Sequence, residues 1–187
     1  MDSVKIADLF VTTALALIGL YLAHSYRRQT ALRVAERRLS VYATLWDKMG
    51  IATPVRIVKW NIQQPLTAKE REELFRIFTA WYFENGNGML LGDGTRSIYL
   101  CVKDNLVCPV EFYEPQSIRE KLQTLQPEEQ SQERGKLAIR QLSLLRTRMK
   151  ADLSIYGVPY HSGLDEDDKA VLRHCGEKLS ARPWASR

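Results

Sequence analysis

The chain has few of the side chains that carry out covalent or metal chemistry. Among its 187 residues are 3 cysteines and 3 histidines. Cys101, Cys108 and Cys175 are odd in number and lack the close paired spacing of a zinc site. Unpaired cysteines of this kind fit a reducing compartment, and Cys101, inside an apolar run, is expected to be a small buried hydrophobe. The sequence therefore predicts no metal site and no cofactor.

A recognisable catalytic set is also missing. His161 and His174, the histidines beyond the N-terminal segment, both lie near the end of the chain. His174 is adjacent to Cys175, but adjacent residues on a helix point about 100° apart and do not form a catalytic pair. No Ser–His–Asp arrangement can be assembled from these positions. We predict no catalytic residues, and the sequence favours a binding protein over an enzyme.

Lys and Arg outnumber Asp and Glu by 27 to 22, and much of this excess lies in one arginine cluster near the N-terminus. Glu36 is the only acid within the cluster. No basic motif interleaved with aromatic residues occurs elsewhere, so no nucleic-acid partner is predicted. Next to an apolar run, such a cluster favours contact with anionic lipid headgroups, at about 1 kcal/mol per exposed basic residue. The predicted membrane-surface residues are Arg27, Arg28, Arg33, Arg37 and Arg38.

An apolar run precedes this cluster. Residues 6–24 read IADLFVTTALALIGLYLAH, and Asp8 is the only formal charge among them. A spanning helix needs about 20 mostly apolar residues, and a cleavable signal peptide has its basic flank on the other side. We therefore predict a single-pass anchor over residues 6–26 in the cell inner (plasma) membrane. Residues 1–5 are expected outside, and the arginine flank keeps the rest cytoplasmic.

Residues 27–50 are predicted to form a basic juxtamembrane helix with an apolar seam over residues 32–49. The seam is compatible with self-association of two chains, but it is shorter than the roughly three to four heptads of a typical coiled coil. We therefore favour packing of the seam against the chain's own domain. Its members, at alternating spacings of three and four, are Leu32, Ala35, Leu39, Tyr42, Trp46 and Met49.

The remainder is predicted to be all-α, with a helical domain over residues 51–157 and a short helix and tail over residues 158–187. Thr67 and Glu70 have the spacing of a capping box at a helix start. Periodic apolar stripes predict further helices, the longest from about Glu128 to Tyr156. Residues 55–64 and 97–102 are ambiguous between helix and strand, with helix favoured for the second segment.

Glycines concentrate between residues 86 and 94, in the stretch GNGMLLGDG. Such a loop can bring backbone amides to a phosphate, but it matches neither established phosphate-binding glycine pattern. Met89, Leu90 and Leu91 inside it favour a packed connection between helices. Rings and guanidinium groups often line binding surfaces, and the possible ligand or partner surface comprises Trp81, Tyr82, Gly86, Gly88, Arg96 and Arg146. We favour the alternative in which the aromatic rings cap an apolar core stripe and the arginines are solvated or pair with carbonyls at helix ends.

Two stretches resemble a known type of protein. They are TAWYFENGNGMLLGDGTRSIYL, residues 79–100, and LSLLRTRMKADLSIYG, residues 142–157. They resemble stretches of uncharacterised bacterial single-pass membrane proteins with a small cytoplasmic helical domain. The resemblance implies no activity. It implies that Thr95 and Thr147, together with the surface named above, belong to one structural theme.

The functional expectation is an accessory, scaffold or interaction module held at the membrane, without a catalytic site. Its partners would be the anionic bilayer and either a membrane or cytoplasmic protein or a second copy of the chain. The alternative is a nucleotide- or small-ligand-binding sensor or enzyme that uses the loop from Gly86 to Gly94. A third hypothesis, a lipid-responsive module, depends on the arginine flank alone.

Overall fold

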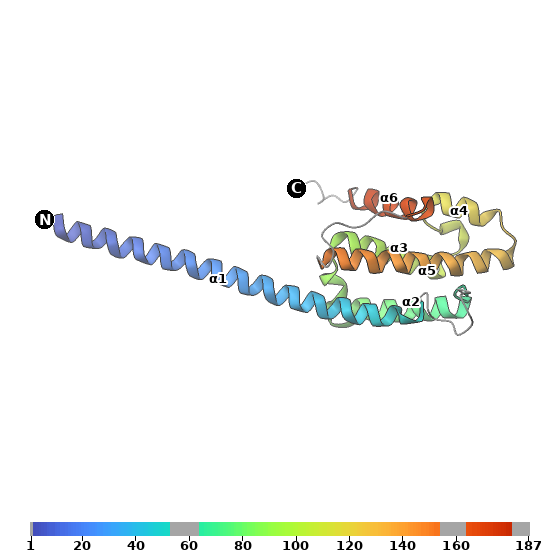
Figure 1. Ribbon diagram of the computed structural model, residues 1–187, viewed down its shortest axis with the longest axis horizontal. Helices are drawn as coiled ribbons and strands as arrows, with labels where there is room; N and C mark the ends of the chain where they lie inside the picture. The colour runs from blue at the N-terminus through green and yellow to red at the C-terminus, as the bar shows by residue number, and fades with distance from the viewer. Residues whose placement is uncertain (1, 53–63, 154–163, 181–187) are drawn as a thin grey trace. The chain divides into compact units, whose positions relative to one another are not determined.

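The computed structural model describes the backbone of residues 2–52, 64–153 and 164–180 (Figure 1). Most of the segment 55–64, left open by the sequence, lies outside these residues. The chain divides into two units, Met1–Ser40 and Val41–Arg187. This division falls inside the predicted juxtamembrane helix of residues 27–50, and each unit is described by itself.

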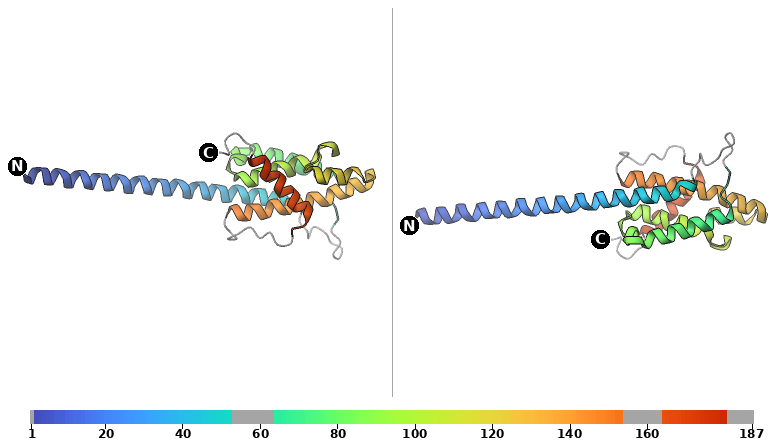
Figure 2. Two further views of the ribbon diagram at one scale, coloured as in Figure 1. Left: turned by 90° about the horizontal axis from the view of Figure 1, so that it is seen from above. Right: turned by 90° about the horizontal axis from the view of Figure 1, so that it is seen from below.

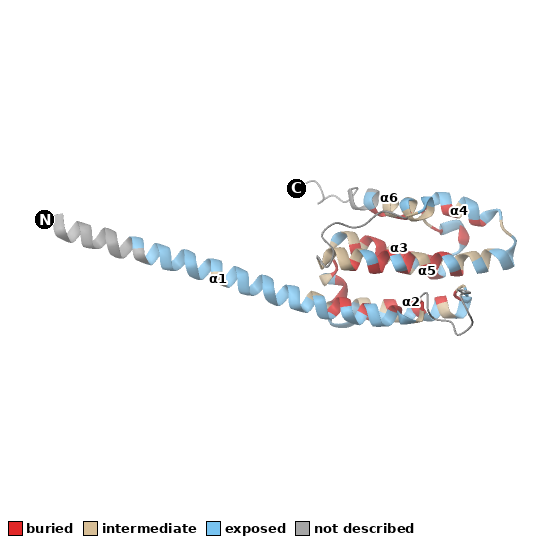
Figure 3. Ribbon diagram, in the orientation of Figure 1, coloured by how far each residue is buried: buried red, intermediate tan, exposed pale blue. Residues whose placement is uncertain are grey.

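The first unit contains the larger part of α1. This helix runs without interruption from Asp2 to Lys48, and its last turns, from Val41 onward, belong to the second unit. Large apolar side chains of this unit are exposed, as the pale ribbon in Figure 3 shows; Leu17 is 62% exposed and Leu20 is 69% exposed. Among the residues that the structure describes, no helix combines the length and apolarity needed to cross a membrane.

The second unit is a helical bundle. All regular structure in the described residues is helical, which confirms the all-α prediction, and residues 97–102 are helical as favoured. After α1, the elements in chain order are η1 (Met49–Ala52), α2 (Ala68–Phe83), η2 (Glu84–Leu90), α3 (Asp93–Val107), η3 (Val110–Phe112), α4 (Gln116–Gln123), α5 (Pro127–Asp152) and α6 (Glu166–Ser180).

Helices α3 and α5 form the middle layer of this unit. In Figure 1, α2 lies on one side of the pair, and α4 and α6 lie on the other. Seen from above in Figure 2, α6 crosses α5 obliquely. Helix α3 packs against α2, α5 and α6, so it is buried on several sides. It carries buried positions on nearly every turn, which explains why its apolar pattern was hard to assign.

The last turns of α1 bury a different face from the predicted seam. Tyr42 and Met49 are buried as that seam requires, but Leu45 is buried with them and Trp46 is 39% exposed. The buried face repeats at intervals of three and four from Tyr42 onward. Packing against the chain's own domain is therefore confirmed for this end of the seam. Self-association through residues 32–49 stays a prediction.

Helix α2 begins as its sequence predicts. The Glu70 amide donates to Thr67 Oγ1 at 3.2 Å, and the Thr67 amide donates to the Glu70 carboxylate at 2.8 Å. This reciprocal pair satisfies two amides that the first turn would otherwise leave without partners. The apolar stripe predicted for this helix is Leu74, Ile77, Phe78 and Trp81; all but Ile77 are buried and Ile77 is half-buried, so the helix presents this stripe to the bundle.

Two helix ends differ from prediction. Helix α5 ends at Asp152 instead of the predicted Tyr156. Helix α6 continues to Ser180, so the prediction of a loose tail from Glu177 is wrong for its first four residues, 177–180. Gly176 lies within the helix, and a Cβ added there would meet nothing within 4 Å. An exposed glycine costs a helix about 1 kcal/mol, which does not suffice to end it.

Gly135 lets α5 pass close to the segment before α2. A Cβ on Gly135 would meet the Leu66 carbonyl oxygen and would lie 2.8 Å from the Leu66 amide nitrogen. Glycine-to-alanine substitutions inside helices usually stabilise by about 1 kcal/mol. We expect Gly135→Ala instead to lower the free energy of unfolding by about 2 kcal/mol, because the backbone has to move apart. Urea unfolding of both proteins measures this.

The matched control is Gly176→Ala in α6, where an added Cβ meets nothing within 4 Å. This variant is expected to be as stable as the parent or up to about 1 kcal/mol more stable. Equal effects of the two substitutions would contradict the close approach at Gly135.

Candidate functional site

The glycine-rich stretch begins in the 3-10 segment η2, passes through Gly92 and ends in the first turn of α3, which contains Gly94. Asn85 has φ of 49° and Gly86 has φ of 70°, in the left-handed region that glycine tolerates best. A Cβ on Gly88 would lie 2.5 Å from the Tyr82 ring. Gly86 therefore permits the turn, and Gly88 permits the close approach of the aromatic ring. Both roles are structural.

The Arg96 guanidinium binds three backbone carbonyls of the loop. Its Nε donates to the Gly88 carbonyl at 3.3 Å, and its Nη2 donates to the carbonyls of Met89 at 3.2 Å and Leu91 at 3.3 Å. The guanidinium group that the sequence predicted for a ligand or partner surface is thus engaged with the loop itself.

The far end of the loop is anchored to α5 through Asp152. The hydroxyls of Tyr42 and Thr95 donate to Asp152 Oδ2 at 2.8 Å and 2.6 Å, and the Gly92 amide donates to the Tyr42 hydroxyl at 3.0 Å. Burial raises the pKa of Tyr42, and the neighbouring Asp152 carboxylate adds to the rise. We call Tyr42, Gly92, Thr95 and Asp152 the loop joint.

The loop joint bears on the alternative of a phosphate cradle. A Cβ at Gly92 would collide with the Asp152 carboxylate, and one at Gly94 would lie 2.6 Å from the Arg148 guanidinium. The space beside these glycines is therefore filled by side chains of α5. A carboxylate next to the Gly92 amide is also unfavourable for a bound anion. This arrangement favours the packed connection, and nucleotide binding by the loop stays without structural support.

Arg146 and Trp81, two further members of the predicted surface, are buried. Arg146 donates to the carbonyls of Met49 at 2.5 Å and Ala52 at 3.4 Å, so it caps the end of α1 and η1. Burial lowers the pKa of its guanidinium. Trp81 donates from Nε1 to Thr44 Oγ1 at 3.0 Å. Both side chains thus donate to the end of α1 or to η1, and neither is available as a ligand surface.

The side chains that this region exposes are different ones. Phe83 is 75% exposed at the end of α2, and Met89 is 81% exposed in η2. The Phe83 ring packs edge-on against Tyr82, with ring centroids 5.3 Å apart, which holds it at the surface. We call Phe83 and Met89 the apolar tip. The sequence does not reveal this pair, because an apolar residue in a helical pattern is expected to be buried whether or not the fold covers it.

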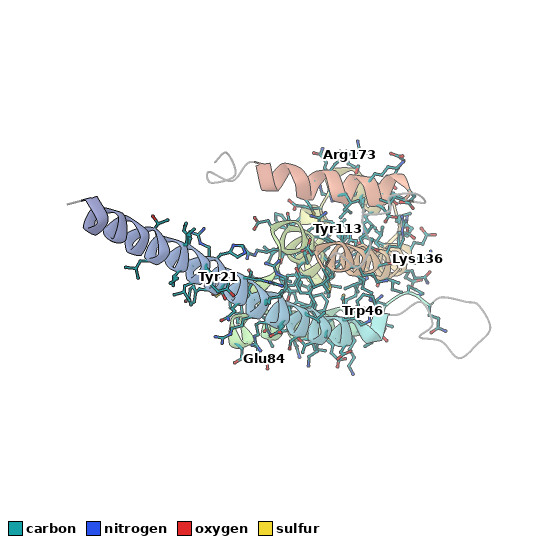
Figure 4. The ribbon with its side chains drawn as sticks, turned by 60° about the vertical axis from the view of Figure 1, so that its left-hand side comes forward. Tyr21, Trp46, Glu84, Tyr113, Lys136 and Arg173 are labelled. Carbon is teal, nitrogen blue, oxygen red and sulfur yellow. The ribbon has the colours of Figure 1, made fainter. Side chains whose placement is uncertain are left out.

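A second constellation was not predicted at all. Cys101 on α3, Glu114 before α4 and His174 on α6 bring their ligand atoms within 4.8 Å of one another. His174 Nε2 lies 2.6 Å from Glu114 Oε2. Tyr113 and Arg173, which directly precede Glu114 and His174 in the chain, are labelled in Figure 4. The sequence predicts Cys101 to be buried, and this is confirmed, but the prediction of no metal site considered only spacing along the chain.

No signal in the sequence brings these residues together, because their numbers differ by 13 and 60 and each lies on a different element. Their convergence depends on how α6 packs on α3. Comparisons of the chain with protein families, with curated proteins and with solved structures found no match. The function is therefore argued from the residues alone.

Proposed function

We propose that this protein is a membrane-tethered helical accessory module, with its bundle on the cytoplasmic side of the inner (plasma) membrane. The exposure of the apolar part of α1 carries the proposal. Leu17, Leu20 and Tyr21 are all more than half exposed (Tyr21 is labelled in Figure 4). A contiguous apolar surface of this kind is rarely left in water. Residues 6–26 would insert into the bilayer, and residues 1–5 would lie beyond it.

The arginine cluster supports this orientation. It begins directly after the apolar run on the same helix, and basic residues flanking a membrane segment are retained on the cytoplasmic side. At 1.5 Å per residue, Arg38 lies about 16 Å further along the helix axis than Arg27. Charges are screened over about 8 Å at physiological salt. Arg27 and Arg28 would therefore contribute most of the headgroup attraction.

The tether is tested by extracting membranes of cells that make the full-length chain with alkaline carbonate. The parent protein is expected to stay in the membrane pellet. Leu17→Arg is expected to move it to the supernatant, because Leu17 lies one residue from the middle of the predicted anchor and an arginine at the centre of an inserted helix costs about 3 kcal/mol. Immunoblotting of the two fractions measures the distribution.

Leu39→Arg is the matched control, since Leu39 is also an exposed leucine of α1 but lies beyond the predicted anchor. We expect this variant to stay in the pellet. Release of the parent protein by carbonate, or equal release of both variants, would refute the tether.

The accessory role rests on the apolar tip and on the absence of a catalytic set from the sequence. Phe83 at the end of α2 and Met89 in η2 are large and exposed, and aromatic residues and methionine are enriched at protein interfaces. A photocrosslinking amino acid at Met89 is expected to capture a discrete protein in intact membranes, whereas one at Phe112, also exposed, is not. Identification of the adduct by mass spectrometry checks this. Equal labelling from the two positions would argue against a specific partner at the tip.

A further inference from the structure

Side chains of the three types that bind zinc converge between α3 and α6. Cys101 offers a sulfur, Glu114 a carboxylate oxygen and His174 a ring nitrogen, and these atoms all lie within 4.8 Å of one another. In a tetrahedral zinc site with bonds of about 2.0–2.3 Å, ligand atoms are about 3.3–3.7 Å apart. We propose that Cys101, Glu114 and His174 bind one Zn²⁺ ion.

Small side-chain rotations suffice to reach that geometry. The 2.6 Å separation of His174 Nε2 and Glu114 Oε2 has to widen by about 0.7 Å for both to bind one ion. The side chains of His174 and Glu114 are 21% and 37% exposed, so both can turn without disturbing the core. Cys101, which is buried, stays in place and supplies the fixed ligand.

The ligand chemistry selects the metal. A thiolate and an imidazole exclude Mg²⁺ and Ca²⁺, which take oxygen ligands. A deprotonated Cys101 and an ionised Glu114 carry two negative charges, which balance Zn²⁺, and neutral His174 adds no charge. Three protein ligands leave a fourth position open, on the side where Glu114 and His174 reach solvent.

Asn105 fixes two of the ligands relative to each other. It lies one turn after Cys101 on α3 and is buried. Its Nδ2 donates to the Glu114 carbonyl at 2.6 Å, and its Oδ1 accepts from the Glu114 amide at 3.1 Å. The same Nδ2 lies 3.7 Å from Cys101 Sγ, within hydrogen-bond reach of a sulfur. Asn105 is thus a positioning residue of the kind that supports metal ligands.

The ion would join α6 to α3 and to the segment before α4. No ligand belongs to α1, so the zinc site does not depend on the membrane tether. The competing explanation is a plain hydrogen bond between His174 and Glu114 beside an inert buried thiol. That explanation predicts no metal affinity at this place, which separates it from ours.

The test uses full-length protein in mild detergent, stripped with a chelator and titrated with Co²⁺ as a spectroscopic substitute for Zn²⁺. We expect one Co²⁺ per chain, tetrahedral visible absorption and a thiolate-to-cobalt charge-transfer band, all displaced by one equivalent of Zn²⁺. Cys101→Ser is expected to abolish the charge-transfer band. Glu114→Gln and His174→Gln are expected to weaken Co²⁺ binding at least tenfold.

Cys175→Ser is the matched control, because Cys175 is also buried and directly follows His174 on α6. It is expected to keep the band and the affinity. Absence of stoichiometric binding, a band that persists in Cys101→Ser, or unchanged affinity in His174→Gln would each overturn the site. Should Cys101→Ser fail to fold, His174→Gln decides the question, because its side chain is partly exposed and its loss leaves the core intact.

Discussion

Replacement of Asp152 with alanine is expected to lower the free energy of unfolding by about 4 kcal/mol. The change removes the acceptor of two hydroxyl donors, Tyr42 at 2.8 Å and Thr95 at 2.6 Å, and the charge that Arg148 faces. Hydrogen bonds to a charged group contribute about 1.5–3 kcal/mol each, and part-buried donors left without an acceptor are costly. Urea unfolding of the full-length protein in mild detergent measures the loss.

The same variant should loosen the glycine-rich loop before the bundle unfolds. Gly92 is held through the Tyr42 hydroxyl, so amide hydrogen exchange is expected to quicken over residues 86–96 and not in α4. Asp152→Asn, which keeps an acceptor oxygen, should cost about half as much.

Asp93→Ala provides the control, because the Asp93 carboxylate is 68% exposed and pairs with Arg96 only at 3.8 Å. Exposed ion pairs contribute less than about 1 kcal/mol. If Asp152→Ala costs no more than this control, the loop joint does not hold the loop.

Trp81→Ala is also expected to cost about 4 kcal/mol. Trp81 is 1% exposed, lies 5.5 Å from the Tyr99 ring between centroids and donates to Thr44 Oγ1 at 3.0 Å. Truncation of a buried tryptophan leaves a large cavity and typically costs about 3–5 kcal/mol. Urea unfolding followed by circular dichroism gives the value without relying on tryptophan fluorescence.

The chain offers a second tryptophan for comparison. Trp46 is 39% exposed, and its ring lies under Lys150 Nζ at 5.1 Å and the Arg146 guanidinium at 5.7 Å. Cation–π contacts at such sites contribute about 0.5–1 kcal/mol each, so Trp46→Ala should cost about 1–2 kcal/mol. Similar costs for the two variants would contradict the burial of Trp81.

Much of the bundle follows from local patterns. The capping box at Thr67 and Glu70 depends on residues three positions apart, and the stripes of α2 and α5 repeat every three to four residues. Interactions of this range are encoded within one helix, so they can be recognised without knowing the partners of that helix. The helical character of residues 97–102 was harder to assign because α3 is buried on several sides.

The roles of the candidate site residues, by contrast, depend on contacts between distant parts of the chain. The sequence leaves two roles open for Arg96 and Arg146, a binding surface or pairing with carbonyls, and in the structure both donate to backbone carbonyls. Which role an arginine takes depends on whether unpaired carbonyls lie within its reach, and those of Met49 and Ala52 are nearly a hundred residues away from Arg146 in the chain. Local spacing carries no information about such a contact.

The sequence by itself determined the helical class, the start of α2 and the approximate start of α5, and the apolar segment with its arginine flank, because each depends on neighbours within about one turn of helix. Only the tertiary structure decided that Asp152 anchors the glycine-rich loop and that Cys101 and His174 meet Glu114. These contacts join separate helices, and the packing of one helix face on another, which no periodicity encodes, sets which side chains converge.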